Sequence, residues 1–255
     1  YAKDRQQLGN ANIECPAVAE NLSVMKAKLD ATRALLYETS RFVDIYKALD
    51  DIAKERKLTP EERAEQKTFA KLADSFTPLA KGMGSEFANQ NAYDCIQIHG
   101  GSGFMKDYAC ERIYRDARIT SIYEGTTQLQ VVAAIRYVTT GAYLNRIKEY
   151  ENAIVAPEME GLHNRLKSMA SKYAACVAQV TEAKDQELLD FCARRLVEMA
   201  AYTIMGHLMV QDASKNAELF GTSAQVFVRY AESEVEKHIN FIRKFDKDDL
   251  AYYRK

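Results

Sequence analysis

Residues that interrupt helices are scarce in this sequence. Its 255 residues include only 11 glycines, 4 prolines and no tryptophan, whereas the dominant residues, Ala, Leu, Glu, Lys and Arg, favour helices. No run of about 18 uncharged apolar residues occurs, which excludes a membrane-spanning helix. We therefore expect a chain that is nearly all helix and that does not cross a membrane.

The sequence also lacks a charge excess of either sign. It has 35 basic and 36 acidic side chains and a formal net charge of -1. Residues 146–255 carry 16 basic and 17 acidic side chains, so the second part is balanced as well. This balance excludes a sequence-wide attraction to nucleic acid or to anionic membranes.

No secretory leader opens the sequence, because a basic start followed by an apolar stretch and a small-residue cleavage site is missing. We expect a cytoplasmic protein, or a mitochondrial matrix protein if the source is a eukaryote. The sequence starts at Tyr1 rather than at a methionine. We therefore also expect it to be a piece of a longer protein.

The cysteines are odd in number, widely spaced and without a Cys-x-x-Cys pair. They are Cys15, Cys95, Cys110, Cys176 and Cys192. This pattern favours buried, reduced thiols over disulfides or a metal site. No metal is expected.

Two long helices are predicted in the first hundred residues. A stripe of apolar residues at helical spacing predicts a first helix that starts after Pro16 and runs to about Leu49. The stripe consists of Val18, Leu22, Met25, Leu29, Leu36 and Val43. A second helix is predicted to start at Pro60, because Thr59 can cap it and Glu62 can reach back to complete a capping box.

Pro78 falls inside the continuation of the second helix. Either the helix kinks near Phe76, or Thr77 caps a new segment that runs on to about His99, and the pattern allows both. Glycines at 100, 101 and 103 are expected to stop this helix, since glycine readily adopts a left-handed backbone.

The remaining helices are expected to be shorter. They are predicted over residues 111–117, from Thr126 or Thr127 to Gly141, and over residues 145–155, 157–183, 185–217 and 222–245, with Gly221 separating the last two. The change from motif-rich to motif-free sequence near Gly141 predicts two domains, residues 1–145 and residues 146–255.

Apolar stripes in the second part indicate the core of a small helical bundle. They are Leu162, Leu166, Met169 and Tyr173, and Leu188, Cys192, Leu196 and Met199. Its histidines, His163, His207 and His238, lie in three separate stretches without ligand spacing. We therefore expect ordinary core or surface histidines rather than metal ligands.

The first motif that suggests a binding site is Gln97-Ile98-His99-Gly100-Gly101-Ser102-Gly103. Consecutive glycines at a helix end leave backbone N–H groups open to a pyrophosphate, with Gln97 as a side-chain donor. The alternative is a plain glycine cap and turn. No strand precedes the motif, as a Rossmann fingerprint requires, and no Gly-Lys-Ser/Thr follows, as in a Walker loop.

The second motif is Ile122-Tyr123-Glu124-Gly125-Thr126. The carboxylate of Glu124 could project from a turn into an apolar site, where desolvation would raise its pKa toward the range of a base. Gly125 would let a substrate backbone or a thioester approach closely. The alternative is a loop acid that interacts with the N-terminus of a helix capped by Thr126.

Taken together, the motifs resemble the C-terminal helical domain of the acyl-CoA dehydrogenase family. The resemblance rests on Gln97-x-x-Gly100-Gly101-x-Gly103-Phe104, Asp107-Tyr108, Glu111-Arg112-x-x-Arg115-Asp116-Ala117-Arg118-Ile119 and Ile122-Tyr123-Glu124-Gly125-Thr126-x-Gln128-x-Gln130. Upstream, Arg5-x-Gln7-Leu8-Gly9 is similar to the family's Arg-x-Gln-Phe-Gly element, with Leu8 in place of the usual Phe. In total the resemblance covers roughly residues 1–145.

The resemblance implies an FAD enzyme that removes an α-proton and a β-hydride from an acyl-CoA thioester and yields the trans-2-enoyl thioester. Glu124 matches the family's catalytic base. Tyr123 and Gly125 would line the acyl and thioester pocket. The reaction would belong to fatty acid or branched-chain acyl-CoA oxidation.

The same resemblance implies a set of cofactor contacts. These are Arg5 and Gln7 at FAD phosphates or adenine, Gln97, Gly100 and Gly101 at the FAD of a neighbouring subunit, and Thr126 and Gln128 as further FAD contacts. The two motifs thus become parts of one site. A homodimer or homotetramer with FAD near the subunit interface is implied, with electron-transfer flavoprotein as the electron acceptor.

Two departures from compact family members stand out. The segment from about Leu49 to Gln66 is longer, and residues 146–255 extend beyond the usual end of the fold. The fold implied is therefore an up-down helical bundle of this family's C-terminal type, followed by a second small helical bundle. The family's N-terminal helical domain and β domain have no counterpart here, so we expect the chain alone to be inactive.

Two other functions share the fold. An acyl-CoA oxidase that uses oxygen has the same motifs and differs mainly in the access of the acceptor. A DNA-associated alkylation-response relative would pair the fold with a basic extension, which the charge balance of residues 146–255 disfavours.

Overall fold

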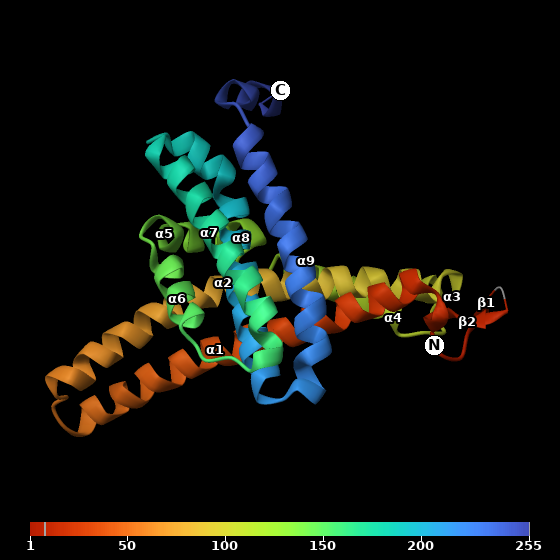
Figure 1. Ribbon diagram of the computed structural model, residues 1–255, viewed down its shortest axis with the longest axis horizontal. Helices are drawn as coiled ribbons and strands as arrows, with labels where there is room; N and C mark the ends of the chain where they lie inside the picture. The colour runs from red at the N-terminus through yellow and green to blue at the C-terminus, as the bar shows by residue number, and fades with distance from the viewer. Residues whose placement is uncertain (8, 255) are drawn as a thin grey trace.

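The computed structural model describes residues 1–7 and 9–254, and these are almost entirely helical (Figure 1). The main helices are α1 (Pro16–Glu55), α2 (Pro60–His99), α3 (Gly101–Phe104), α4 (Cys110–Thr120), α5 (Thr127–Thr139), α6 (Ala142–Glu151), α7 (Glu160–Glu182), α8 (Gln186–Lys215) and α9 (Ala217–Lys244). The 3-10 helices are η1 (Asn12–Glu14), η2 (Pro157–Met159) and η3 (Lys247–Tyr253), and two short strands, β1 (Gln6–Gln7) and β2 (Asn10–Ala11), form a hairpin. The prediction of an all-α fold is confirmed.

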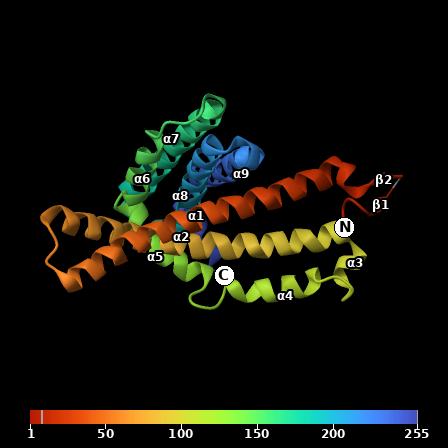
Figure 2. The same cartoon turned by 90° about the horizontal axis from the view of Figure 1, so that it is seen from below.

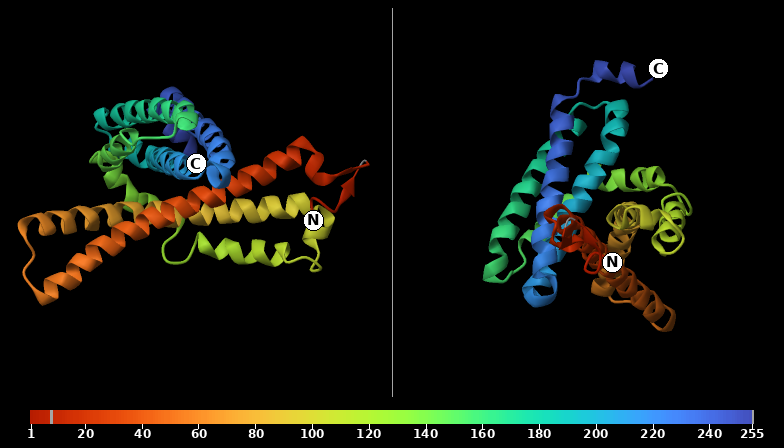
Figure 3. Two further views of the ribbon diagram at one scale, coloured as in Figure 1. Left: turned by 60° about the horizontal axis from the view of Figure 1, so that its bottom comes forward. Right: turned by 90° about the vertical axis from the view of Figure 1, so that its right-hand side faces the viewer.

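The long helices α1 and α2 form an antiparallel pair that runs the length of the molecule. Figure 2 shows α4 alongside α2, on the side of α2 that faces away from α1. Helices α7, α8 and α9 pack together and cross this pair, as the right-hand view of Figure 3 shows. The α4–α5 connection thus lies on one side of the α1–α2 pair and the α7–α9 bundle on the other.

Helix α2 begins at Pro60, as the sequence predicted. The Thr59 hydroxyl accepts a hydrogen bond from the Glu62 amide at 3.2 Å, and the Glu62 carboxylate accepts one from the Thr59 amide at 2.9 Å. With Pro60 in the first turn, both halves of the predicted capping box are present.

Helix α1 is longer than predicted, and a different face of it is buried. It continues to Glu55 rather than ending near Leu49. In the predicted stripe, Leu29 and Leu36 are 42% and 49% exposed, whereas the adjacent face with Ala31 is completely buried. That face also carries Leu35 and Phe42, which are both 0% exposed, so packing against the neighbouring helices selected it.

Pro78 neither ends α2 nor starts a new helix. The helix runs unbroken to His99, so the alternative in which Thr77 caps a new segment is wrong. The Thr77 hydroxyl instead donates to the Ala73 carbonyl at 2.8 Å, and the buried Tyr143 hydroxyl donates to the Ser75 carbonyl at 2.6 Å. These hydrogen bonds satisfy carbonyl groups in the helical turn before Pro78. A proline lacks the N–H group and so weakens the backbone hydrogen bonding there.

Gly221 does not separate the last two long helices, which corrects the sequence prediction. It lies inside α9, and the break falls at Asn216, whose side chain accepts a hydrogen bond from the Leu219 amide at 3.0 Å. Asparagine is a strong N-cap, and this signal outweighs an isolated glycine that a helix interior tolerates.

One hydrophobic core runs through both parts of the chain. Buried side chains of α1 and α2 are continuous with those of α5 to α9. Residue 145 lies inside α6, so the division into residues 1–145 and 146–255 stays a prediction. Within the described part of the chain, no helix is both long and apolar enough to cross a membrane.

The five cysteines are free, but not all of them are buried. Cys110, Cys176 and Cys192 are buried as expected, whereas Cys15 is exposed and Cys95 is half-buried. The expectation of buried thiols is therefore wrong for Cys15 and Cys95. Cys15 directly precedes α1, and Cys95 lies in the last turns of α2.

Candidate functional site

The predicted base lies in the turn that joins α4 to α5. Glu124 has a φ of 51° and Gly125 a φ of 94°, so two successive residues adopt a left-handed backbone. This conformation is uncommon for a residue other than glycine and persists only where the surroundings impose it. The Glu124 side chain is exposed at the surface of this turn.

Side chains from α2 and α5 hold the turn in place. Lys81 Nζ donates to the Gly125 carbonyl at 2.5 Å and lies 5.9 Å from the centre of the Tyr123 ring. Gln130 Nε2 donates to the carbonyls of Glu124 and Gly125 at 3.3 Å and 3.4 Å. A Cβ on Gly125 would come within 2.7 Å of that nitrogen, so the turn requires glycine both for its φ and for its space.

The threonines after the turn begin α5. The Thr126 hydroxyl accepts a hydrogen bond from the Leu129 amide at 3.4 Å, which confirms the predicted cap. Thr127 donates from its hydroxyl to Glu86 Oε1 at 2.6 Å and ties α5 to α2. The positive end of the α5 dipole therefore lies directly beyond Gly125.

This chain does not supply the apolar enclosure expected around Glu124. Tyr123 is 50% exposed and Ile122 is 44% exposed, and neither covers the carboxylate. The sequence suggested an apolar site because these two residues precede Glu124. In the fold, the side chains of Ile122, Tyr123 and Glu124 are all exposed to solvent. Any desolvation of the Glu124 carboxylate therefore has to come from groups beyond the described residues.

A polar cleft of about 690 Å³ opens beside the turn, between α4 and the α1–α2 pair. It is lined by Lys28, Glu86, Asn89, Gln90, Tyr93, Asp94, Tyr114, Arg118, Ser121, Ile122, Thr126, Thr127 and Gln128. Thr126 and Gln128, both predicted as cofactor contacts, thus reach the same cleft. Glu124 is not among the residues that line it.

Lysines of the two long helices are the functional candidates that the sequence did not reveal. Lys28 is buried in the wall of the cleft, donates to Gln90 Oε1 at 2.9 Å and lies 4.7 Å from the centre of the Tyr230 ring. Burial lowers the pKa of Lys28. Lys28 and Lys81 occupy ordinary positions of helical patterns, so no sequence signal distinguishes them from surface lysines.

The predicted phosphate motif lies where α2 ends. Gly100 has a φ of 59° and its amide donates to the Gln97 carbonyl at 3.1 Å, which is the expected glycine cap. Residues 101–104 form the short helix α3 rather than an open loop, because the Gly103 amide donates to the Gly100 carbonyl at 2.9 Å. A Cβ on Gly100 or Gly101 would meet no atom within 4 Å, so the backbone there is open to a close approach.

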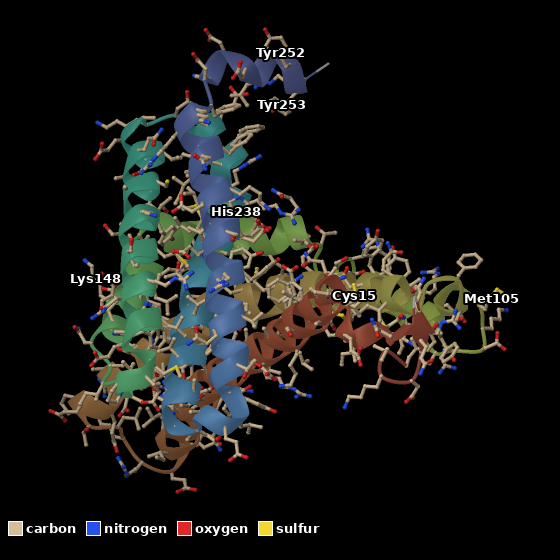
Figure 4. All side chains as sticks on the ribbon, turned by 45° about the vertical axis from the view of Figure 1, so that its right-hand side comes forward. Cys15, Met105, Lys148, His238, Tyr252 and Tyr253 are labelled. Atoms are coloured by element: carbon tan, nitrogen blue, oxygen red, sulfur yellow. The ribbon has the colours of Figure 1, made fainter. Side chains whose placement is uncertain are left out.

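Gln97 faces a second cleft of about 740 Å³, which is largely apolar. Its lining residues are Tyr93, Ile96, Gln97, Phe104, Met105, Lys106, Asp107, Glu111 and Tyr114. Met105 lies at the outer tip of this end of the molecule (Figure 4) and is 54% exposed.

The N-terminal hairpin brings Arg5 and Gln7 to the same end. The Asn12 amide donates to the Arg5 carbonyl at 2.8 Å, and both predicted side chains are exposed. Tyr1 anchors the segment, since its ring stacks on His99 at 4.3 Å and its hydroxyl donates to the His99 carbonyl at 3.1 Å. Leu8, which departs from the family pattern, lies outside the described residues.

The predicted site residues therefore form two groups in the chain rather than one. Tyr123, Gly125 and their neighbours lie at the C-terminal end of α4, and Gln97 and the glycines lie near its N-terminal end. An 11-residue helix separates them, roughly 16 Å long. Because the first motif was expected at the FAD of a neighbouring subunit, the expectation that both motifs form one site stays a prediction.

Comparisons with known families cover nearly the whole chain. Residues 1–138 match the family described as "Acyl-CoA dehydrogenase, C-terminal domain". Residues 139–250 match "Acyl-CoA dehydrogenase C terminal".

Curated relatives match about half of the chain. It is 34% identical over 130 residues to the caffeyl-CoA reductase-Etf complex subunit CarC of Acetobacterium woodii. The matched region covers 51% of this chain and 28% of that protein. It is 31% identical over 141 residues to an acyl-CoA dehydrogenase of Bacillus subtilis, covering 55% of this chain and 31% of the relative. The chain thus spans less than a third of the length of these proteins.

Solved structures share the fold at lower identity. An acyl-CoA dehydrogenase from Bacillus anthracis, complexed with FAD, has a TM-score of 0.71 at 22% identity over 99% of this chain and 46% of its own. ACDH-11 of Caenorhabditis elegans, in complex with C11-CoA, has a TM-score of 0.66 at 21% identity over 91% of this chain and 38% of its own.

Proposed function

The chain belongs to the acyl-CoA dehydrogenase family, and from this membership we propose that it carries the catalytic base of an FAD-dependent enzyme that oxidises acyl-CoA thioesters. The reaction removes the α-proton and the β-hydride and yields the trans-2-enoyl thioester. Fatty or branched-chain acyl groups are the proposed substrates.

The observation that carries this proposal is the backbone of Glu124 and Gly125. Their left-handed pair is held by Lys81 and Gln130, and this keeps an exposed carboxylate at a defined point of the surface. Holding a base where a substrate's α-carbon can meet it removes much of the entropic barrier to proton transfer. Strain that is retained in such a turn supports a functional role.

The turn also offers a hydrogen-bond donor for the thioester. Within residues 1–7 and 9–254, the Glu124 amide N–H donates to no other group. An N–H that is free in the turn could donate to a thioester carbonyl and stabilise the negative charge that develops when the α-proton leaves. Gly125 and Tyr123 would line the space next to the thioester.

The residues present fit a flavin nucleotide. Thr126 and Gln128 offer hydroxyl and amide groups at a polar cleft, and the backbone at Gly100 and Gly101 is open to a phosphate. FAD, when bound, supplies the hydride acceptor. The chain's own part would be to bind the nucleotide through these groups and to hold the proton acceptor.

The separation of the two groups supports an oligomer. Arg5, Gln7 and Gln97 lie beyond the N-terminal end of α4, whereas Glu124 follows its C-terminal end, and we propose that the first group contacts the FAD of a neighbouring subunit in a dimer or tetramer. Electron-transfer flavoprotein is the proposed acceptor, since one relative is a subunit of a caffeyl-CoA reductase-Etf complex. The cytoplasm or the mitochondrial matrix is the proposed location.

Glu124→Gln in the full-length, flavin-loaded protein tests the proposal. Amide for carboxylate keeps the shape and removes the base, so exchange of the α-proton of a bound acyl-CoA for deuterium should fall by about 10²–10⁴-fold. The flavin absorbance should be unchanged. Glu158→Gln, at an exposed glutamate of η2, is the control and should exchange normally. Undiminished exchange in Glu124→Gln would remove the basis of the proposal.

A further inference from the structure

Cys95, His99 and Cys110 converge where α2 ends and α4 begins. One ligand atom of each lies within 4.8 Å of the other two. Cys95 and His99 are one turn apart on α2, so they share a face, whereas Cys110 comes from the first residue of α4. Their sequence separation hides this cluster, which the packing of α4 against α2 creates.

The spacing of these atoms is close to that of a zinc site. Cys95 Sγ lies 3.9 Å from His99 Nδ1. A tetrahedral zinc ion, with Zn–S near 2.3 Å and Zn–N near 2.0 Å, places its ligand atoms roughly 3.5–3.8 Å apart. Small side-chain rotations are therefore sufficient to bring all three ligands onto one ion.

The surroundings restrain each ligand. Tyr1 stacks on the His99 ring at 4.3 Å, and Tyr108 meets the same ring edge-on at 5.2 Å. Cys110 is buried and its Sγ donates to the Gly103 carbonyl at 3.4 Å. Cys95 and His99 are half-buried, which leaves a path for an ion from solvent.

Without a bound cation, His99 and Cys110 make hydrogen bonds to nearby backbone carbonyls. Burial and the neighbouring Cys110 raise the pKa of Cys95. His99 Nδ1 lies 2.7 Å from the Cys95 carbonyl oxygen and donates its proton there. A bound cation would displace the ligand protons, as metal ions do when they bind thiol and imidazole groups.

We propose that Cys95, His99 and Cys110 bind one zinc ion, with water in the fourth position. Two sulfur ligands and one imidazole suit zinc better than calcium or magnesium, which prefer oxygen. The ion joins the C-terminal end of α2 to the N-terminal end of α4 across the connection that contains Gly100 and α3. It therefore braces the proposed nucleotide-binding turn from a position remote from Glu124.

Cobalt titration of the reduced, full 255-residue chain tests the site. Co²⁺ reports thiolate ligation by an intense sulfur-to-cobalt charge-transfer band and tetrahedral geometry by its visible d–d bands. We expect one equivalent of Co²⁺ to bind and Zn²⁺ to displace it. The measurement needs no flavin or substrate, so it is independent of the proposed enzyme activity.

Variants locate the ligands. Cys95→Ser and Cys110→Ser should each weaken the charge-transfer band by about half or more, since each removes one of the two thiolates, and His99→Gln should weaken Zn²⁺ binding by more than the ~10–100-fold that loss of an outer partner costs. Cys15→Ser, at the exposed cysteine labelled in Figure 4, is the matched control and should bind normally. Circular dichroism confirms that each variant is folded, and Cys95→Ser, at a half-buried position, serves if Cys110→Ser does not fold.

Three outcomes would overturn the proposal. One is the absence of a charge-transfer band in the reduced wild-type chain. Another is a band that persists unchanged in folded Cys95→Ser. The third is a Cys95–Cys110 disulfide in the isolated chain that, once reduced, binds no cobalt, which would make the pair a redox couple rather than a metal site.

Discussion

The Ser223 hydroxyl in α9 donates a hydrogen bond of 2.6 Å to the Asp30 carboxylate in α1, across 193 residues of sequence. Both side chains are buried, and Lys26 forms an ion pair with the same carboxylate. A buried carboxylate needs such partners, because losing one leaves a desolvated charge partly unsatisfied. This bond therefore joins the long helical pair to the C-terminal bundle.

Removal of the Ser223 hydroxyl should lower stability. Ser223→Ala is expected to reduce the free energy of unfolding by about 1–3 kcal/mol, measured by urea denaturation. Ser233→Ala, at an exposed serine of the same helix, should change it by less than about 0.5 kcal/mol. Equal effects of the two substitutions would show that the contact with Asp30 does not stabilise the fold.

His207 should be replaceable by an apolar residue with a gain in stability. Its ring is 1% exposed and neither ring nitrogen has a hydrogen-bond partner among the described residues. Leucine has a similar size and no polar atom to satisfy, so His207→Leu should raise the free energy of unfolding by about 1–3 kcal/mol at pH 7.5. As a contrast, His238→Leu should destabilise, since His238 Nε2 lies 2.9 Å from a carboxylate oxygen of Glu198. A loss of stability in His207→Leu would contradict this account.

Protonation of the same residue should make the fold sensitive to acid. Burial, with lesser effects of His163 and Lys167, lowers the pKa of His207 from 6.5 to about 3. The unfolded chain takes up this proton below about pH 6.5 and the folded chain does not until about pH 3. His207 therefore removes about 1.4 kcal/mol of stability for each pH unit in that window as the pH falls.

The His207→Leu variant isolates this effect. Other groups titrate alike in both proteins, so the difference in unfolding free energy between variant and wild type should widen from pH 7.5 to pH 4.5. A difference that stays constant with pH would mean that His207 becomes protonated in the folded state.

Gly125 should not tolerate a side chain. Gly125→Ala places a Cβ at a φ of 94° and displaces the Gln130 amide that holds the turn, so it should cost about 1–3 kcal/mol. Gly161→Ala, in α7 with open space around it, should instead be neutral or stabilising by up to about 1 kcal/mol. Thermal unfolding of both variants checks the contrast, and a neutral Gly125→Ala would show that the turn is not constrained.

Local sequence signals predicted the helices and their caps well. The capping box of Thr59 and the cap at Thr126 depend on atoms within three or four residues, so sequence reasoning finds them. Gly221 misled it and Pro78 left two alternatives open, because burial in the core and hydrogen bonds from distant side chains compensate for what these residues weaken. The exposure of Glu124 was missed for the same reason, since the neighbours that would cover a side chain cannot be read from adjacent residues.

The sequence by itself determined that this chain is helical, where most of its helices begin, and that its motifs resemble one family of flavoenzymes. Only the tertiary structure decided that Lys81 holds the turn of Glu124, that Lys28 is buried in the wall of the cleft, and that Cys95, His99 and Cys110 meet. The physical reason is the sequence distance over which each feature is determined. Helix formation and capping depend on contacts within one turn, whereas the convergence of side chains depends on how distant helices pack.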